Sequence, residues 1–443
     1  MVLKYSQNKI KFTSFSSHSI INKSVELMNV IAVIILTALI INFLLSTVSD
    51  YLNIKNLRVK LPDEFRDVYD EERYKKSQQY TLERTKFSYF PEVSSLAIIL
   101  VFWFSGGFNY LDLYLRGFGY SPIITGVMYI GVIMIAQSII SLPFSLYSTF
   151  VIEEKYGFNK TDLKTFIIDR LKGALLSFII GVPVLALILY LLGEAGEWAW
   201  LYAWGAVTII SLFIQFLAPT YIMPLFNKFT PLEEGELRNM IFDYAQKVGF
   251  PLQNIYVMDG SKRSTKSNAF FTGFGRSKRI ALFDTLIEKH TNDELLAVLA
   301  HEIGHYKKKH IQTSMIISIL HFGVLFYLLS LFLNSDALFE AFYMDNNSIY
   351  AGLIFFGMLF SPIEMILGIS MNILSRKNEF EADNYAATTL EKPLSLVSGL
   401  KKLSSDNLSN LTPHKFYVFL NYSHPPVLQR IVQIKKAAND SDR

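Results

Sequence analysis

The chain alternates between long apolar runs and segments rich in charged residues. Each apolar run is close to the roughly 20 residues that a helix needs to cross a bilayer. The second run contains Gly106 and Gly107, and the fourth contains Pro183, where we expect a kink. The predicted spans cover residues 27–48, 90–108, 122–147, 173–192, 198–217, 311–333 and 350–374. This pattern predicts a mainly α, polytopic membrane protein.

The polar segments divide the chain into four expected parts. Residues 1–217 form an N-terminal membrane region with five spans and cytoplasmic loops, and residues 218–310 form a soluble insert. Residues 311–374 hold the last two spans, and residues 375–443 form a charged helical tail. Residues 50–86 are also charged, and we expect a helix there that faces water.

Lys and Arg gather on one side of the predicted membrane. The loops after the second, fourth and sixth spans are nearly free of them, and residues 334–347 carry only acidic charges. Since cytoplasmic loops are enriched in Lys and Arg, the insert and the tail are predicted to face the cytoplasm. Lys4, Lys9, Lys11 and Lys23 near the N-terminus argue the other way.

Composition agrees with a membrane protein and narrows the chemistry. Of 443 residues, 51% are hydrophobic and 18% are charged, whereas soluble domains average about 25% charged. The net charge of +4 is spread over several loops, so we expect no nucleic-acid partner. The chain has no cysteine, so a zinc site must use His and carboxylate ligands.

The most informative motif is His301-Glu-Ile-Gly-His305, an HExxH sequence. Positions i and i+4 share one face of a helix, so both imidazoles can bind one metal ion, and Glu302 can act on water without being a ligand. Thr291 and Glu294 form the capping box that typically starts a helix. The alternative is a charged helix end with solvated histidines.

A catalytic zinc site needs a third protein ligand. Glu379 and Asp383 are four residues apart and share a helix face, whereas Glu381 points about the other way. One carboxylate of the pair can bind the metal while the other accepts the second N–H of a ligating His. The alternative is a solvated acidic helix face.

Two further stretches carry candidate substrate contacts. His424 stands before two prolines and is rigidly presented, so it could donate a hydrogen bond to an oxyanion; otherwise it is a structural loop histidine. Residues 267–283 predict two short strands with turns at Gly273 and Gly275. An edge strand there could pair with an extended substrate, and the Asn268 side chain could then bind the substrate backbone. The alternative is a plain hairpin with no role in binding.

Ionisable side chains inside the spans and three other histidines complete the candidates. His321 and Glu364 lie within predicted spans, where such residues line a functional cavity or join two helices. His290, His310 and His414 are expected to be surface or interface residues.

Together these motifs resemble the integral-membrane type I CAAX prenyl endopeptidases, which are zinc metalloproteases of the gluzincin group. The resemblance covers nearly the whole chain and includes family-specific stretches. These are IEEKYGFNKTD, PLFNKFTPLEEGELR, SNAFFTGFGRSKRIALFDTLI, HEIGHYKKKH, SRKNEFEADNYA and YSHPP.

The resemblance implies a fold and a set of roles. Seven helices would enclose a water-filled chamber, with a gluzincin-like protease domain holding one Zn²⁺ per chain. Glu379 would be the third ligand beside His301 and His305, with Asp383 behind them. His424 would act in the transition state, and Asn268 and Ala269 would contact the substrate backbone, with Glu302 as general base.

The implied function is an integral-membrane zinc metalloendopeptidase that cleaves the C-terminal tripeptide from prenylated CAAX proteins. Its partners would be a peptide or protein substrate and the lipid bilayer, in the ER membrane of a eukaryote or the inner or plasma membrane of a prokaryote. One alternative is a quality-control protease that clips misfolded or stalled membrane proteins. Another, from a different class, is a zinc transporter or sensor.

Overall fold

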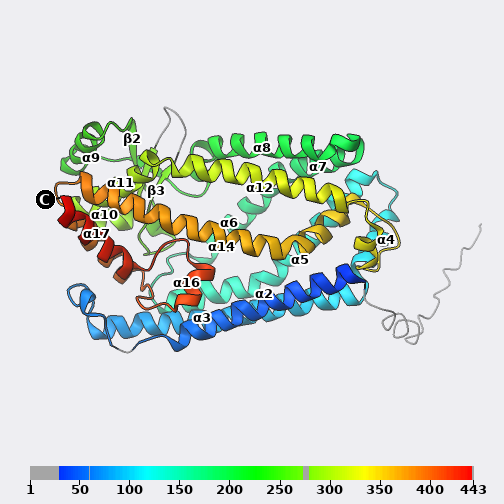
Figure 1. The fold of residues 1–443 in the computed structure, drawn as a ribbon, viewed down its shortest axis with the longest axis horizontal. Coiled ribbons are helices and arrows are strands. Elements are labelled where there is room, and N and C mark those ends of the chain that lie inside the picture. Colours follow the sequence, from blue (N-terminus) through cyan, green and yellow to red (C-terminus); the bar gives the residue numbers. More distant parts are fainter. Residues whose placement is uncertain (1–28, 59, 273–278, 442–443) are drawn as a thin grey trace, which may run out of the picture.

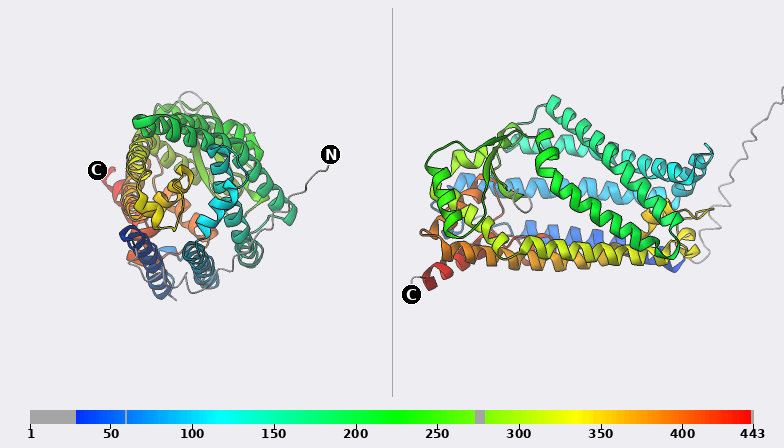
Figure 2. Two further views of the ribbon diagram at one scale, coloured as in Figure 1. Left: turned by 90° about the vertical axis from the view of Figure 1, so that its right-hand side faces the viewer. Right: turned by 90° about the horizontal axis from the view of Figure 1, so that it is seen from above.

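The computed structural model describes residues 29–58, 60–272 and 279–441. Long helices run along the longest axis of the molecule, and the strands lie with several shorter helices at one end (Figure 1). The right-hand view of Figure 2 shows the same division from above. The first residues of the predicted first span, the four N-terminal lysines, and Gly273 and Gly275 lie outside the described residues.

The α-helices among the described residues are α2 (Val30–Lys55), α3 (Glu71–Phe104), α4 (Gly107–Arg116), α5 (Pro122–Tyr147), α6 (Leu163–Leu176), α7 (Val182–Glu194), α8 (Ala199–Leu217), α9 (Glu236–Lys247), α10 (Asp284–Lys289), α11 (Asn292–Lys307), α12 (His310–Phe332), α13 (Asp336–Glu340), α14 (Ile349–Thr389), α15 (Leu394–Asp406), α16 (Lys415–Asn421) and α17 (Val427–Ser441). Short 3₁₀ and π segments join some of them: η1 (Asp63–Phe65), η2 (Ser148–Glu153), η3 (Ser177–Gly181), η4 (Gly196–Trp198), η5 (Ala218–Ile222), η6 (Met223–Leu225) and η7 (Gly260–Lys262).

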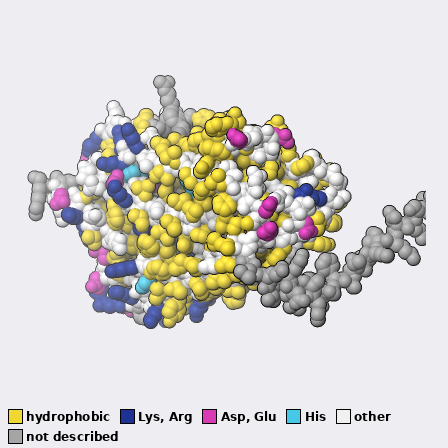
Figure 3. Space-filling view, turned by 45° about the vertical axis from the view of Figure 1, so that its right-hand side comes forward, with side chains coloured by type: hydrophobic (Ala, Val, Ile, Leu, Met, Phe, Trp, Pro, Cys, Tyr) yellow, Lys and Arg dark blue, Asp and Glu magenta, His cyan; other side chains and the backbone are white. Residues whose placement is uncertain are grey.

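Within the described residues, seven helical segments are long and apolar enough to cross a membrane, which confirms the predicted polytopic fold. Little of their apolar surface is buried inside the protein: at most 28% of each apolar window. Apolar side chains such as Ile139, Phe178 and Ile209 are exposed. Figure 3 shows hydrophobic side chains covering much of the middle of one face of the molecule. Apolar surface on this scale is suited to lipid rather than to water.

The second and seventh spans end elsewhere than predicted, and the fourth changes its helical pattern near its proline. The second span is part of α3, which starts in the charged segment and ends before Gly106, where the backbone turns with φ +71°. The predicted end at residue 108 was therefore wrong. In the fourth, Pro183 is the second residue of α7, just after the π segment η3, where the helical hydrogen-bond pattern changes. The seventh continues without a break through Glu379, so α14 is both a span and part of the candidate site.

A four-stranded sheet lies in the predicted insert. Its strands are β1 (Phe229–Pro231), β2 (Asn254–Met258), β3 (Ala269–Thr272) and β4 (Arg279–Phe283), in the order β1-β2-β4-β3. The antiparallel pair β3 and β4 was predicted, whereas β1 and β2 were not. Since β3 pairs only with β4 among the described strands, it forms an edge of the sheet.

Two hydrophobic cores correspond to the two ends of the molecule. One packs β2 and β4 against α9, α11, α15 and α17, with Leu299 and Ile303 among its buried residues. The other packs the spans around α14, with Phe342 and Phe355 stacked in it. His321 on α12 and Glu364 on α14 lie 3.0 Å apart, so these two predicted intramembrane residues join neighbouring helices.

Candidate metal centre

Helix α11 positions the two histidines of the HExxH motif. Its start is fixed by the predicted capping box, in which Thr291 and Glu294 each bond the backbone of the other. Leu295, Leu299 and Ile303 anchor one side of the helix in the core. The same helical periodicity brings the His301 and His305 rings together, with centroids 4.8 Å apart.

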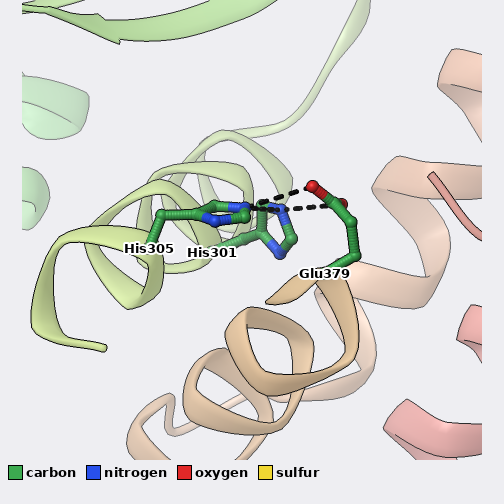
Figure 4. Close-up of side chains that lie close together, drawn as sticks. All are labelled: His301, His305 and Glu379. Atoms are coloured by element: carbon green, nitrogen blue, oxygen red, sulfur yellow. Dashed lines mark hydrogen bonds and ion pairs between the residues drawn. The ribbon is translucent and has the colours of Figure 1, made fainter. Parts of the chain in front are cut away.

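Helix α14 brings Glu379 against α11. The two helices approach closely at Gly304, where an added Cβ would lie 3.1 Å from the backbone of Ala382. Gly304 is therefore the residue that lets the helices pack at this distance. Figure 4 shows the Glu379 carboxylate directed at both imidazoles across the α11–α14 contact.

The three side chains form a compact set of donor atoms. His301 Nε2 and His305 Nε2 are 3.2 Å apart, and they lie 3.4 Å and 3.3 Å from the two oxygens of Glu379. Ligands at zinc bond lengths of about 2.0–2.1 Å in a tetrahedron are separated by about 3.3–3.4 Å. The spacing therefore fits one metal ion held by His301, His305 and Glu379.

The hydrogen bonding of Glu379 also fits a metal ligand. Its Oε2 atom is buried and has no hydrogen-bond partner among the described residues. Arg430 Nη1 and His301 Nε2 each lie 3.4 Å from this oxygen without bonding it, so its burial is only partly compensated, and a bound cation would complete its coordination. The residues present therefore fit the metal that the HExxH motif implies.

Behind His301, Asp383 and Arg430 form a buried ion pair. Asp383 Oδ1 lies 2.9 Å from His301 Nδ1, which leaves His301 Nε2 for the metal position. Arg430 on α17 donates to both oxygens of Asp383, at 2.8 Å and 2.6 Å. Burial and Arg430 act to lower the pKa of His301, but hydrogen bonds to Asp383 and Glu379 raise it to about 9. Arg430 was not predicted.

Behind His305, a second chain of contacts leads to Glu381. His305 Nδ1 lies 3.0 Å from Nδ1 of His310, and His310 Nε2 lies 3.2 Å from a Glu381 oxygen. His310 is buried, so its prediction as a surface or interface residue missed this contact. Lys309, at φ +60°, makes the turn between α11 and α12 that brings His310 back to the motif.

His424 lies on the open side of the metal position. Its Nε2 is 3.3 Å from a Glu379 oxygen, and its Nδ1 is 2.9 Å from Ser423 Oγ. Arg376 and Asn372 on α14 donate to backbone oxygens of α16 and of the following loop, so α14 positions His424 as well as Glu379. The side chain is exposed, which leaves room for a substrate.

The structure also describes the remaining predicted site residues, Glu302, Asn268 and Ala269. Glu302 is half-buried on α11 and is not one of the three clustered ligands. Asn268 is exposed just before β3, and its Oδ1 accepts from the Ala269 N–H at 2.9 Å. Helix α11 contacts β3, and the role of Asn268 and Ala269 in substrate binding stays a prediction.

A cavity of about 400 Å³ adjoins the cluster on the membrane side. His305 and His310 line it together with polar residues of three spans, including Ser211 of α8, Ser314 of α12 and Asn378 of α14. The metal position therefore borders a partly polar space between membrane helices.

Two family models match this chain. Residues 50–228 match the family model described as CAAX prenyl protease N-terminal, five membrane helices, and residues 231–438 match Peptidase family M48. Two family models thus cover most of the chain. The four-part division given above stays a prediction.

Relatives are similar over nearly the whole chain. The CAAX prenyl protease 1 homolog of Oryza sativa subsp. japonica is 37% identical over 87% of this chain and 94% of its own length. CAAX prenyl protease 1 of Saccharomyces cerevisiae is 36% identical over 85% of this chain and 88% of its own. The human homolog is 35% identical over 85% and 88%.

A solved structure agrees with these relatives. The crystal structure of S. mikatae Ste24p superposes with a TM-score of 0.86 and 34% identity, covering 91% of this chain and 99% of that one. The chain therefore belongs to the CAAX prenyl protease 1 family and is an integral-membrane metalloprotease of peptidase family M48.

Proposed function

We propose that this protein is a zinc endopeptidase that removes the C-terminal tripeptide from prenylated CAAX proteins at the cytoplasmic face of a membrane. The observation that carries the proposal is the donor set of His301, His305 and Glu379, with His424 on its open side. The names of relatives that match nearly full length support the substrate class. Membership of a peptidase family counts against the zinc transporter or sensor.

One Zn²⁺ would be held by His301, His305 and Glu379. Bound there, it would polarise the scissile carbonyl and make a water molecule easier to deprotonate. Asp383 would fix the orientation of His301 by its contact with Nδ1, and Arg430 would hold Asp383 in place.

Proton transfer and charge stabilisation fall to two side chains. Glu302 takes a proton from the attacking water and passes it to the leaving amine. His424 donates from Nε2 to the developing oxyanion. Ser423 Oγ beside Nδ1 supports this tautomer, because a hydroxyl donating to Nδ1 leaves the ring proton on Nε2.

Substrate binding involves the edge strand and the membrane. An extended peptide adds to β3, where Asn268 and Ala269 contact its backbone. The substrate would lie beside a chamber between the spans, and the cavity lined by His305 and polar residues of three spans supports this. A prenyl chain gains about 0.8 kcal/mol for each CH₂ buried in lipid or on apolar walls.

The test compares two peptides in detergent. One is a farnesylated peptide ending in a CAAX sequence, and the other is the same peptide without the lipid. We expect zinc-dependent release of the last three residues, faster for the farnesylated peptide. Glu302→Gln should retain one zinc per chain by elemental analysis and lose activity about a hundredfold or more. Glu288→Gln, which changes an exposed carboxylate on α10, is the matched control and should be as active as the native protein.

The outcomes separate the hypotheses. Equal cleavage of both peptides would support the quality-control protease rather than CAAX processing. A Glu302→Gln variant as active as the native protein would contradict the assigned proton transfer. No cleavage of either peptide by zinc-loaded protein would contradict the proposed substrate.

A further inference from the structure

The two histidines at the metal position have different neighbours behind them. His301 Nδ1 lies 2.9 Å from a carboxylate oxygen of Asp383. His305 Nδ1 instead lies 3.0 Å from Nδ1 of His310. The outer nitrogen of a ligating histidine usually donates its proton to a carboxylate, a backbone carbonyl or water. The contact behind His305 departs from this arrangement, so its proton positions decide whether His305 can bind a metal.

The turn between α11 and α12 places His310 behind His305. In an uninterrupted helix, a residue five positions after His305 would lie about 140° round the helix axis. Instead α11 ends at Lys307, and Lys309 adopts φ +60°, a conformation that residues with a Cβ rarely adopt. His310 then starts α12 with its side chain buried. The His305 and His310 ring planes are 72° apart, so the rings meet edge-on rather than stacked.

Glu381 on α14 holds the other side of the His310 ring. Its Oε2 atom lies 3.2 Å from His310 Nε2. The other oxygen of Glu381 lies 3.8 Å from Lys377 Nζ. An ionised carboxylate only accepts hydrogen bonds, so His310 Nε2 is the donor in this contact.

Only one set of proton positions fits both contacts and a metal. With its proton on Nε2, neutral His310 has a lone pair on Nδ1, which accepts from the N–H of His305 Nδ1. His305 Nε2 is then left with a lone pair, 3.3 Å from a Glu379 oxygen at the metal position. The reverse set, with His305 Nδ1 as the acceptor, would put a proton on His305 Nε2 and prevent it from binding a metal.

The cavity beside these rings explains why a fixed acceptor matters. His305 and His310 both line the space of about 400 Å³ between α8, α12 and α14. A polar space of this size can hold water. Water both donates and accepts, so a water molecule behind His305 would allow either tautomer. His310, held by Glu381, allows only the tautomer that leaves His305 Nε2 free.

We propose that His310 and Glu381 are positioning residues that fix His305 in its metal-binding tautomer. The inference rests on the zinc site of the proposed function and adds two residues to it. Asp383 fixes His301 directly, whereas Glu381 fixes His305 through one additional imidazole. Helix α14 thus supplies Glu379 as a ligand and, two and four residues later, the carboxylates that orient the other two ligands.

The test compares two substitutions of His310 in zinc-binding measurements that need no substrate. His310→Asn keeps an acceptor oxygen close to the position of Nδ1, whereas His310→Phe fills the same space without an acceptor. We expect His310→Phe to lower zinc affinity about 10–100-fold in competition with a chelator, and His310→Asn to stay close to native. With Co²⁺ in place of zinc, the visible absorption bands should shift in the Phe variant and not in the Asn variant. At zinc concentrations that fill the site, His310→Phe should lower kcat and leave KM nearly unchanged.

Glu381 gives a second readout at a half-exposed side chain, where substitution removes no core packing. Glu381→Ala removes the acceptor behind His310, and Glu381→Gln keeps an oxygen there. We expect the Ala variant to lose about tenfold in zinc affinity and the Gln variant to bind zinc nearly as the native protein does. Glu288→Ala, at an exposed carboxylate on α10, is the control and should bind zinc as the native protein does.

The outcomes separate this inference from the proposed function. A His310→Phe variant with native zinc affinity and a native Co²⁺ spectrum would overturn the role of His310 and leave the protease intact. Equal losses in the Phe and Asn variants would also overturn it, because the acceptor atom would then make no difference. Native zinc affinity in Glu381→Ala would overturn the role of Glu381. If the expected differences in zinc binding appeared but no CAAX peptide were cut, this inference would stand and the proposed substrate would fail.

Discussion

At the scale of single residues, Arg430 is central to the site although it belongs to none of the expected motifs. It is buried, pairs with Asp383 and lies 3.4 Å from Glu379. Burial acts to lower its pKa, but the charges of Asp383 and Glu379 raise it. One guanidinium therefore offsets part of the negative charge of two buried carboxylates and fixes the residue that orients His301.

Substituting Arg430→Lys should weaken metal binding. Lysine keeps the positive charge, but its ammonium group cannot bond both oxygens of Asp383 in the bidentate geometry that the planar guanidinium gives. Loss of such a contact behind a ligand typically costs 10–100-fold in metal affinity. Competition with a zinc chelator would measure the change, with Arg66→Lys as a control at an exposed ion pair. Unchanged affinity would show that Asp383 is held without Arg430.

The residues that could be predicted are those whose partners are set by local spacing. His301 and His305 share a helix face by periodicity alone, and the Glu379–Asp383 spacing gives a second shared face. Arg430 and His310 could not be found in this way, because their contacts depend on how α17 and α12 fold back onto α11. The turn at Lys309 is the local feature that redirects His310.

At the scale of elements, the site depends on the crossing of α11 and α14. Two ligands come from one helix and the third from the other, so the metal position exists only where the helix axes are close. Gly304 provides that closeness and stands within the HExxH motif, between the two ligands.

Substituting Gly304→Ala should therefore disturb the metal site. The added Cβ meets backbone at 3.1 Å, so the helices must separate by a few tenths of an ångström or more. We expect zinc affinity and kcat to fall, with a lower Tm in detergent. Gly131→Ala on α5, where no atom of the described structure lies within 4 Å of the added carbon, is the control. It should be neutral or slightly stabilising, since Ala favours helix by about 1 kcal/mol. Equal behaviour of the two variants would contradict the role of Gly304 in allowing α11 and α14 to cross closely.

The elements that the sequence did not predict lacked a periodic signal. β1 has three residues, and β2 (NIYVM) has no clear alternation. β2 pairs in parallel with β4. Parallel strands are not joined by a hairpin turn, so no local turn motif in the sequence predicts this pairing. Helix α14 was predicted as two separate helices, because its composition changes from apolar to charged near residue 375. The helical backbone continues through this point without a break.

At the scale of the whole molecule, orientation in the membrane remains a proposal that a labelling experiment can test. The chain has no cysteine, so single cysteines can be introduced against a clean background. Asn346 lies on the acidic loop between the last two spans, and Asn439 lies on α17, and both are exposed.

In sealed vesicles whose outer face is the cytoplasmic one, we expect Asn439→Cys to react with a membrane-impermeant maleimide directly, and Asn346→Cys to react only after the membrane is permeabilised. The unsubstituted protein gives the blank. The reverse pattern would place the metal site on the far side and would contradict a cytoplasmic protease.

The continuity of α14 has a mechanical consequence. Its 41 residues span about 60 Å, roughly twice the hydrocarbon thickness of a bilayer. One end of α14 lies in lipid. The other end carries Glu379, together with Arg376 and Asn372, which bond the backbone near His424. Bilayer thickness biases the tilt of a transmembrane helix. A change in the tilt of α14 would therefore change the distance between Glu379 and α11. Lipid thickness is thereby expected to tune the alignment of the catalytic groups.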